Sequence, residues 1–82
     1  MYYIYIIRCT DGSLYTGITD NVARRFVRHK KRKGGHYTAS HAVLRVLHTE
    51  ACGTKSAALK REAQIKSWRR KKKLELIKKS GP

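Results

Sequence analysis

The sequence predicts a small α+β domain in which helices flank a three-stranded antiparallel sheet, with the element order ββαβαα. Two apolar runs rich in tyrosine, isoleucine and threonine, separated by a turn sequence, open the chain and have the pattern of a β-hairpin. Helical spacing of apolar residues appears in the second half of the chain. With 82 residues, the chain is predicted to form a single domain over 1–82.

The predicted hairpin consists of strands over 2–8 and 14–19. Their sequences, YYIYIIR and LYTGIT, are aromatic and β-branched, which is typical of strands. Asp11 and Gly12 between them are residues that favour a tight turn.

The loop length decides whether two tyrosines of the hairpin share a face of the sheet. A two-residue turn places Tyr5 and Tyr15 on opposite faces, because side chains alternate along a strand. A three-residue loop over 11–13 pairs Cys9 with Tyr15 and brings both tyrosines to the same face. A shared tyrosine site therefore predicts the longer loop or a β-bulge.

Three helices and one further strand are expected after the hairpin. They are a helix over 22–33 with Asp20 or Asn21 as its N-cap, a strand over 42–50, a helix over 55–68 with Thr54 as its N-cap, and a short helix over 69–80. Gly34 and Gly35 are expected to end the first helix. The sequence CGT at 52–54 is expected to break the strand.

The charge of the chain indicates a polyanionic partner. Twenty Lys and Arg residues face five Asp and Glu residues, giving a formal net charge of +15. Such an excess attracts nucleic acid, whose phosphates release counterions when basic side chains neutralise them. The basic runs at 28–36 and 69–73 are expected to follow a nucleic-acid backbone without reading its sequence.

Membrane insertion, secretion and zinc binding are not indicated. There is no long apolar run, and Arg8 interrupts the first apolar stretch too early for a signal peptide. Cys9 and Cys52 belong to no CxxC pair, so we expect free thiols in a reducing compartment. The alternative is that Cys52 acts as a nucleophile with His48 as its base, but nothing else in the sequence supports this.

Two features of the predicted helices carry candidate chemistry. Glu62 lies within the apolar arc of the helix over 55–68, where it either pairs with Lys66 or serves as a ligand for a hard divalent cation. Arg25 and His29 are four residues apart and share a helix face. They are either solvated positions of a basic helix or contacts to a phosphate.

These residues together resemble the GIY-YIG nuclease superfamily. The two name-giving motifs correspond to YIY at 3–5 and YTG at 15–17, about ten residues apart. NVARR with a histidine four residues on, and ALKREAQIK around the glutamate, follow in the same order. The resemblance covers nearly the whole chain and is greatest to the small stand-alone bacterial branch.

The resemblance implies a division of roles for phosphodiester hydrolysis. Glu62 would hold a single Mg²⁺ or Mn²⁺ ion, Arg25 would bind the scissile phosphate, and Tyr15 would orient or deprotonate the attacking water. A phenol has an unperturbed pKa of about 10, so a nearby cation would have to favour its ionised form. Tyr5 and His29 would position water and phosphate or assist proton transfer. The predicted substrate contacts are Gly17, Tyr37, His41, Lys66, Arg69, Arg70 and Lys71.

The predicted function is a divalent-metal-dependent endonuclease that hydrolyses DNA, with structured or damaged DNA in repair or recombination as its substrate. The alternative is a nucleic-acid-binding module with the same fold and little or no catalysis. We expect DNA rather than RNA as the partner, no membrane association, a monomer or weak dimer, and a cytoplasmic, nucleoid-associated location. A protein partner that supplies targeting is left open.

Overall fold

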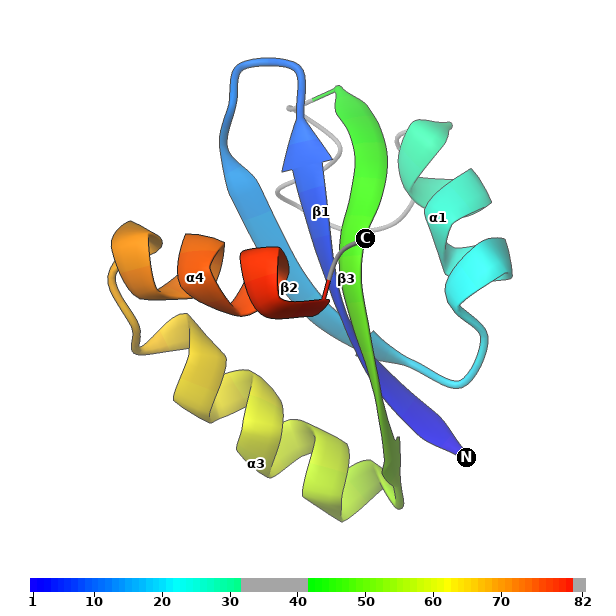
Figure 1. The fold of residues 1–82 in the computed structure, drawn as a ribbon. Coiled ribbons are helices and arrows are strands. Elements are labelled where there is room, and N and C mark those ends of the chain that lie inside the picture. The colour runs from blue at the N-terminus through cyan, green and yellow to red at the C-terminus, as the bar shows by residue number, and fades with distance from the viewer. Residues whose placement is uncertain (32–41, 81–82) are drawn as a thin grey trace.

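The computed structural model describes residues 1–31 and 42–80 of the chain. Its elements are the strands β1 (Tyr2–Cys9), β2 (Leu14–Thr19) and β3 (Val43–Gly53) and the helices α1 (Val22–Lys30), α3 (Lys55–Lys66) and α4 (Arg70–Ser80) (Figure 1). The three strands form one antiparallel sheet, and the element order is ββαβαα. The predicted α+β fold class is confirmed.

Strand β1 is the centre of the sheet, because the strand order is β2-β1-β3. Its four residues from Ile4 to Ile7 are buried in succession. A strand that is covered on both faces reads as a continuous apolar run rather than as an alternating one. This explains why YYIYIIR lacks the polar alternation of β-strands with one solvent-exposed face.

The hairpin loop has three residues, but it spans 10–12 rather than the predicted 11–13. The Cys9 amide donates to the Ser13 carbonyl over 2.9 Å, and Gly12 has a φ of 87°. A three-residue hairpin loop needs its left-handed residue at the last position, which only glycine adopts without strain. Tyr15 therefore pairs with Ile7, and the predicted pairing with Cys9 is wrong by two residues. An even shift preserves the side-chain faces.

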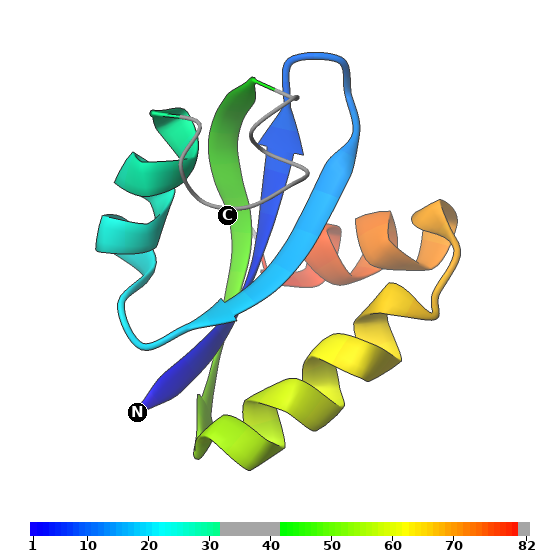
Figure 2. The same cartoon turned by 180° about the vertical axis from the view of Figure 1, so that it is seen from behind.

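The sheet separates two layers of helices (Figures 1 and 2). On one face, Ile4 and Ile6 of β1 pack with Ile65 of α3. Leu76 and Ile77 of α4 also pack against this core. The other face of β1 carries Tyr5 and Ile7, and α1 lies on that side.

Both predicted N-caps form. The Asn21 side chain accepts a hydrogen bond from the Arg24 amide over 3.0 Å, which decides between Asp20 and Asn21. The Thr54 hydroxyl accepts from the Ala57 amide over 3.1 Å. Each cap satisfies an amide that has no partner within its helix.

The predicted end of the third strand at Glu50 is wrong, although the strand does end within the CGT sequence at 52–54. Strand β3 continues to Gly53, because Tyr2 and Tyr3 at the start of β1 pair with Gly53 and Ala51. This long-range pairing overrides the turn propensity of the local sequence. Helix α1 ends at Lys30, and the expected stop at Gly34 and Gly35 lies outside the described residues.

Candidate active site

Two tyrosines and a histidine converge on the α1 face of the sheet. The Tyr5 hydroxyl lies 2.9 Å from Nε2 of His29. The Tyr5 and Tyr15 rings have centroids 6.2 Å apart, and the His29 ring is 5.3 Å from that of Tyr15. The prediction that both tyrosines share a face is therefore correct, although its register was not.

Gly17 makes room for the Tyr5 ring. The two residues are directly paired across the hairpin and so share a face. A Cβ atom added at Gly17 would lie 2.5 Å from the Tyr5 hydroxyl oxygen and 2.6 Å from the ring carbon that bears it. The glycine of the YTG motif thus lets the phenol lie directly over β2.

Arg25 and Glu62 are also close to the Tyr5 phenol. Burial raises the pKa of Tyr5 to about 12, while a hydrogen bond from Arg25 acts in the opposite direction. The negative charges of ionised Tyr15 and of Glu62 oppose ionisation of Tyr5 further. Side chains from β1, β2, α1 and α3 therefore meet around one phenol. We call Tyr5, Tyr15, Arg25, His29 and Glu62 the active-site cluster.

The hydrogen bond between Tyr5 and His29 has a defined direction at neutral pH. Burial and the positive charges of Arg25 and Arg28 lower the pKa of His29 to about 4, so its imidazole is neutral. Tyr5 keeps its proton because its pKa is about 12. The Tyr5 hydroxyl consequently donates to Nε2, and the histidine proton resides on Nδ1.

Glu62 lies on the buried stripe of α3 with Ala58 and Ile65, and its side chain is only 20% exposed. The predicted ion pair is present, with Lys66 Nζ 3.5 Å from Glu62 Oε2. Lys66 Nζ also lies 6.0 Å from the centre of the Tyr15 ring. This second contact was missed, because it joins α3 to β2 and leaves no signal in the local spacing.

Other predicted substrate contacts lie elsewhere. Tyr37 and His41 fall outside the described residues. Arg69 directly precedes α4, while Arg70 and Lys71 form its first turn, and α4 packs on the sheet face opposite the tyrosines.

The Cys52 and His48 alternative gains no support from the structure. His48 Nε2 lies 2.7 Å from the Glu50 carboxylate, and Arg61 Nε donates to the same carboxylate over 2.9 Å. Cys52 Sγ is directed to the Glu50 carbonyl. These side chains tie β3 to α3 through an ion-pair network.

The donor set of the site suits a weakly held hard cation. Among residues 1–31 and 42–80, no group of three His, Cys, Asp or Glu side chains could enclose a metal ion. Glu62 offers one half-buried carboxylate at the edge of the cluster. Mg²⁺ commonly binds one or two carboxylates and completes its shell with water and substrate phosphate.

A family model described as the GIY-YIG catalytic domain matches residues 1–75. The chain belongs to the GIY-YIG family. The GIY-YIG domain is a nuclease fold, and this placement supports an endonuclease, a hydrolase that acts on nucleic acid. The resemblance drawn from the sequence motifs is therefore confirmed.

Relatives of similar length align with nearly the whole of this GIY-YIG chain. It is 45% identical over 76 residues to a UPF0213 protein of Staphylococcus saprophyticus, covering 93% of both chains. It is 44% identical over 77 residues to a UPF0213 protein of Staphylococcus aureus, covering 94% of both. The solution NMR structure of a UPF0213 protein from Bacillus halodurans matches with a TM-score of 0.64 and 39% identity, over 99% of this chain and 87% of that one.

Across the described part of this GIY-YIG chain, no helix is both long and apolar enough to cross a membrane.

The pKa of His29 predicts how stability depends on pH. The unfolded chain protonates this imidazole near pH 6.5, whereas the folded protein does so only near pH 4. Stability should therefore fall by up to about 3 kcal/mol as the pH decreases through this window. Urea unfolding between pH 7 and pH 4 measures the effect. His29→Gln should remove this part of the pH dependence. An NMR titration that finds His29 half protonated near pH 6.5 would contradict the prediction.

Proposed function

We propose that the protein is a divalent-metal-dependent DNA endonuclease whose active-site cluster hydrolyses phosphodiester bonds. The observation that supports this most directly is the convergence of a carboxylate, a guanidinium group, a histidine and a second phenol around the buried Tyr5. Phosphodiester hydrolysis needs a cation to offset the charge of the phosphate and a group that orients water. The cluster offers residues of both kinds. We further propose structured or damaged DNA as the substrate, in repair or recombination.

Glu62 would hold the ion, Mg²⁺ or Mn²⁺, which supplies positive charge for the phosphate and the leaving oxygen. Arg25 of α1, which hydrogen-bonds to the Tyr5 phenol, would bind a phosphate oxygen through its guanidinium fork. Lys66 adds a third positive group beside Glu62 and Tyr15. Together these side chains favour an anion at the centre of the cluster.

The two tyrosines have different environments and therefore different roles. Tyr5 is 2% exposed, has a pKa raised to about 12 and donates to His29, so it remains a neutral phenol that positions its neighbours. Tyr15 is partly exposed on β2, so its hydroxyl can contact a water molecule. Tyr15 is thus the residue that orients the attacking water or takes its proton.

A second candidate function is a nucleic-acid-binding module with little catalysis. The ion pair between Lys66 and Glu62 favours it, because the carboxylate proposed for the metal already has a cationic partner at 3.5 Å. The two candidates differ in one consequence: only the nuclease needs the Tyr15 hydroxyl.

Tyr15→Phe is expected to reduce single-turnover nicking of supercoiled DNA by about 10²-fold or more, which is typical for the loss of a proton-transfer or positioning group. The assay uses Mg²⁺ or Mn²⁺ with protein in excess over DNA. Tyr2→Phe is the matched control, because it removes a hydroxyl from the same hairpin outside the cluster. Equal nicking by both variants would exclude the role of Tyr15. Metal-independent binding without nicking by the native chain would favour the binding module.

A further inference from the structure

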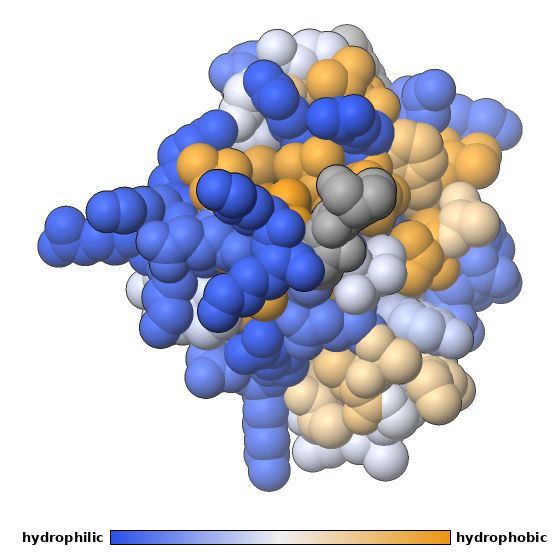
Figure 3. All heavy atoms as spheres, in the orientation of Figure 1, coloured by the Kyte–Doolittle hydropathy of each residue, from blue (hydrophilic) through white to orange (hydrophobic). Residues whose placement is uncertain are grey.

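The sheet face opposite the active-site cluster carries its own concentration of positive charge. Side chains alternate along β1, so Arg8 shares a face with Ile4 and Ile6 rather than with Tyr5. Helix α4 lies across this face (Figure 1). Figure 3, in the same orientation, shows hydrophilic side chains gathered over α4. Arg8 and helix α4 therefore lie on the side of the sheet that faces away from the proposed site of hydrolysis.

Two arginines stand directly opposite each other on this face. Arg8 of β1 pairs with Arg45 of β3, and both side chains are exposed. Like charges in a facing cross-strand position destabilise a sheet. Within the described residues, neither guanidinium group forms an ion pair with a carboxylate. The arrangement is one that a bound anion would stabilise.

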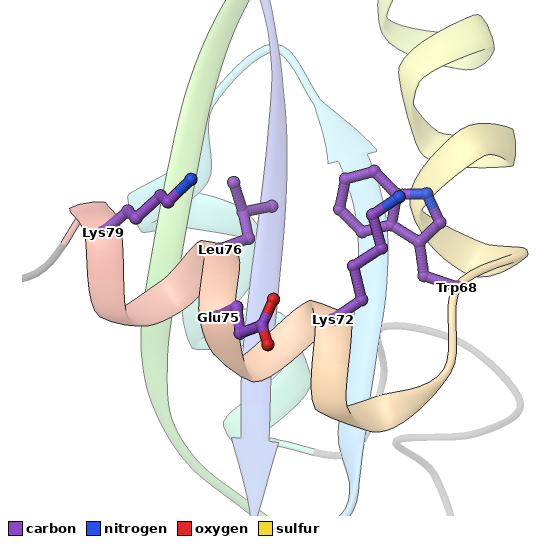
Figure 4. A pocket seen from close by; sticks show the side chains of 5 residues that line it. All are labelled: Trp68, Lys72, Glu75, Leu76 and Lys79. Atoms are coloured by element: carbon purple, nitrogen blue, oxygen red, sulfur yellow. The ribbon is translucent and has the colours of Figure 1, made fainter.

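Helix α4 extends the positive surface. Its sequence RKKKLELIKKS has six cations and a single acid. A pocket of about 120 Å³ on one flank is lined by Trp68, Lys72, Glu75, Leu76 and Lys79 (Figure 4). In that view the Lys72 and Lys79 side chains extend to the same side of the helix.

The tryptophan in this pocket supports cations rather than a stacked base. Lys72 Nζ lies 4.5 Å from the centre of the Trp68 ring, and the Arg61 guanidinium carbon lies 5.2 Å from it. Such cation–π contacts hold the charged groups in place. The surface thus presents ammonium and guanidinium groups, which recognise phosphates without reading bases.

One DNA duplex could not contact both faces. The molecule measures 27 × 27 × 25 Å, and the sheet with its helices separates the cluster from α4. The persistence length of DNA is about 150 bp, so wrapping a short duplex around a body of this size costs far more than a gentle bend. Simultaneous use of both faces requires two DNA segments.

We propose that this second face binds a second duplex segment of DNA while the first lies at the active-site cluster. The binding groups, which we call the α4 surface, are Arg8, Arg45, Arg70, Lys72, Lys78 and Lys79. The proposal rests on the proposed function for the identity of the polyanion as DNA. It narrows the substrate class to DNA with two duplex arms, such as a branch point.

A duplex-capture experiment tests this without cleavage. Protein carrying Glu62→Gln is bound to a duplex fixed on beads, and retention of a second, fluorescent duplex is measured over a range of salt concentrations. Adding either Arg8→Gln with Arg45→Gln, or Lys78→Gln with Lys79→Gln, should reduce the affinity for the second duplex at least about tenfold. Each pair should also lower the log–log salt slope by about 2, because each phosphate contact contributes about 0.9.

The matched control is Lys55→Gln with Lys60→Gln, which removes the same charge from exposed positions of α3. Capture should persist in this control. Equal loss in all three pairs, no capture by the parent protein, or capture of RNA but not DNA would overturn the proposal. So would capture confined to concentrations at which sedimentation shows a dimer. Failure of the native chain to nick DNA, with capture by the Glu62→Gln protein retained, would count against the nuclease function and leave the α4 surface in place.

Discussion

Replacing Glu62 with glutamine should reduce single-turnover DNA cleavage by about 10³-fold, which corresponds to a loss of about 4 kcal/mol of transition-state stabilisation. Gln has nearly the same shape but no negative charge, so it would no longer hold a divalent cation next to the phosphate. DNA binding should persist or become tighter, because the substitution also removes a charge that repels phosphate. The half-buried position of Glu62 beside Lys66 predicts that the fold tolerates the change.

Parallel measurements of nicking and of DNA affinity on the same protein preparation separate the two effects. Asp20→Asn is the control, because it removes one negative charge from an exposed ion pair with Arg24. That pair contributes little to stability at the surface. A Glu62→Gln protein that cleaves as fast as the Asp20→Asn protein would show that the carboxylate does not take part in hydrolysis.

Gly17→Ala should cost about 1–3 kcal/mol of stability and abolish most of the cleavage. The added Cβ would lie 2.5 Å from the Tyr5 hydroxyl oxygen, which is closer than atoms of side chains approach each other. The obstacle is a rigid ring near its attachment to the hydroxyl, so a small rotation of a flexible chain cannot relieve the clash. Displacing the ring would break its hydrogen bond to His29.

A double-mutant cycle shows whether this contact is the cause. Tyr5→Ala removes the ring, so adding Gly17→Ala to it should cost much less than Gly17→Ala alone. A second readout is the pKa of His29, which should rise from about 4 as displacement of the ring lets water reach the imidazole. Full additivity of the two substitutions, with an unchanged His29 pKa, would contradict the steric explanation.

Local sequence signals were sufficient for the order of the elements and for contacts within one helix. Composition and turn residues located the hairpin, and the caps at Asn21 and Thr54 followed from the side chains that accept helix amides. The ion pair between Glu62 and Lys66 followed from their four-residue spacing. In each case the interacting groups are close in sequence, so the geometry of the local element determines whether they meet.

The hairpin register, the length of β3 and the assembly of the site were not predictable in the same way. The position of Gly12 in its loop changed the register by two residues, and the extra length of β3 came from its pairing with Tyr2 and Tyr3. The convergence of Arg25 and Glu62 on Tyr5 depends on where two helices pack. Only the ordered set of motifs, through its family resemblance, pointed to that arrangement.

The central place of β1 has a consequence for how the site is maintained over time. Hydrogen bonds to neighbours on both sides and four buried residues in succession make this strand the segment expected to open last. Tyr5 belongs to it, so the organising phenol of the cluster resists local fluctuation. The position of Tyr5, and with it the arrangement of the cluster, is therefore expected to be lost only when the whole domain unfolds.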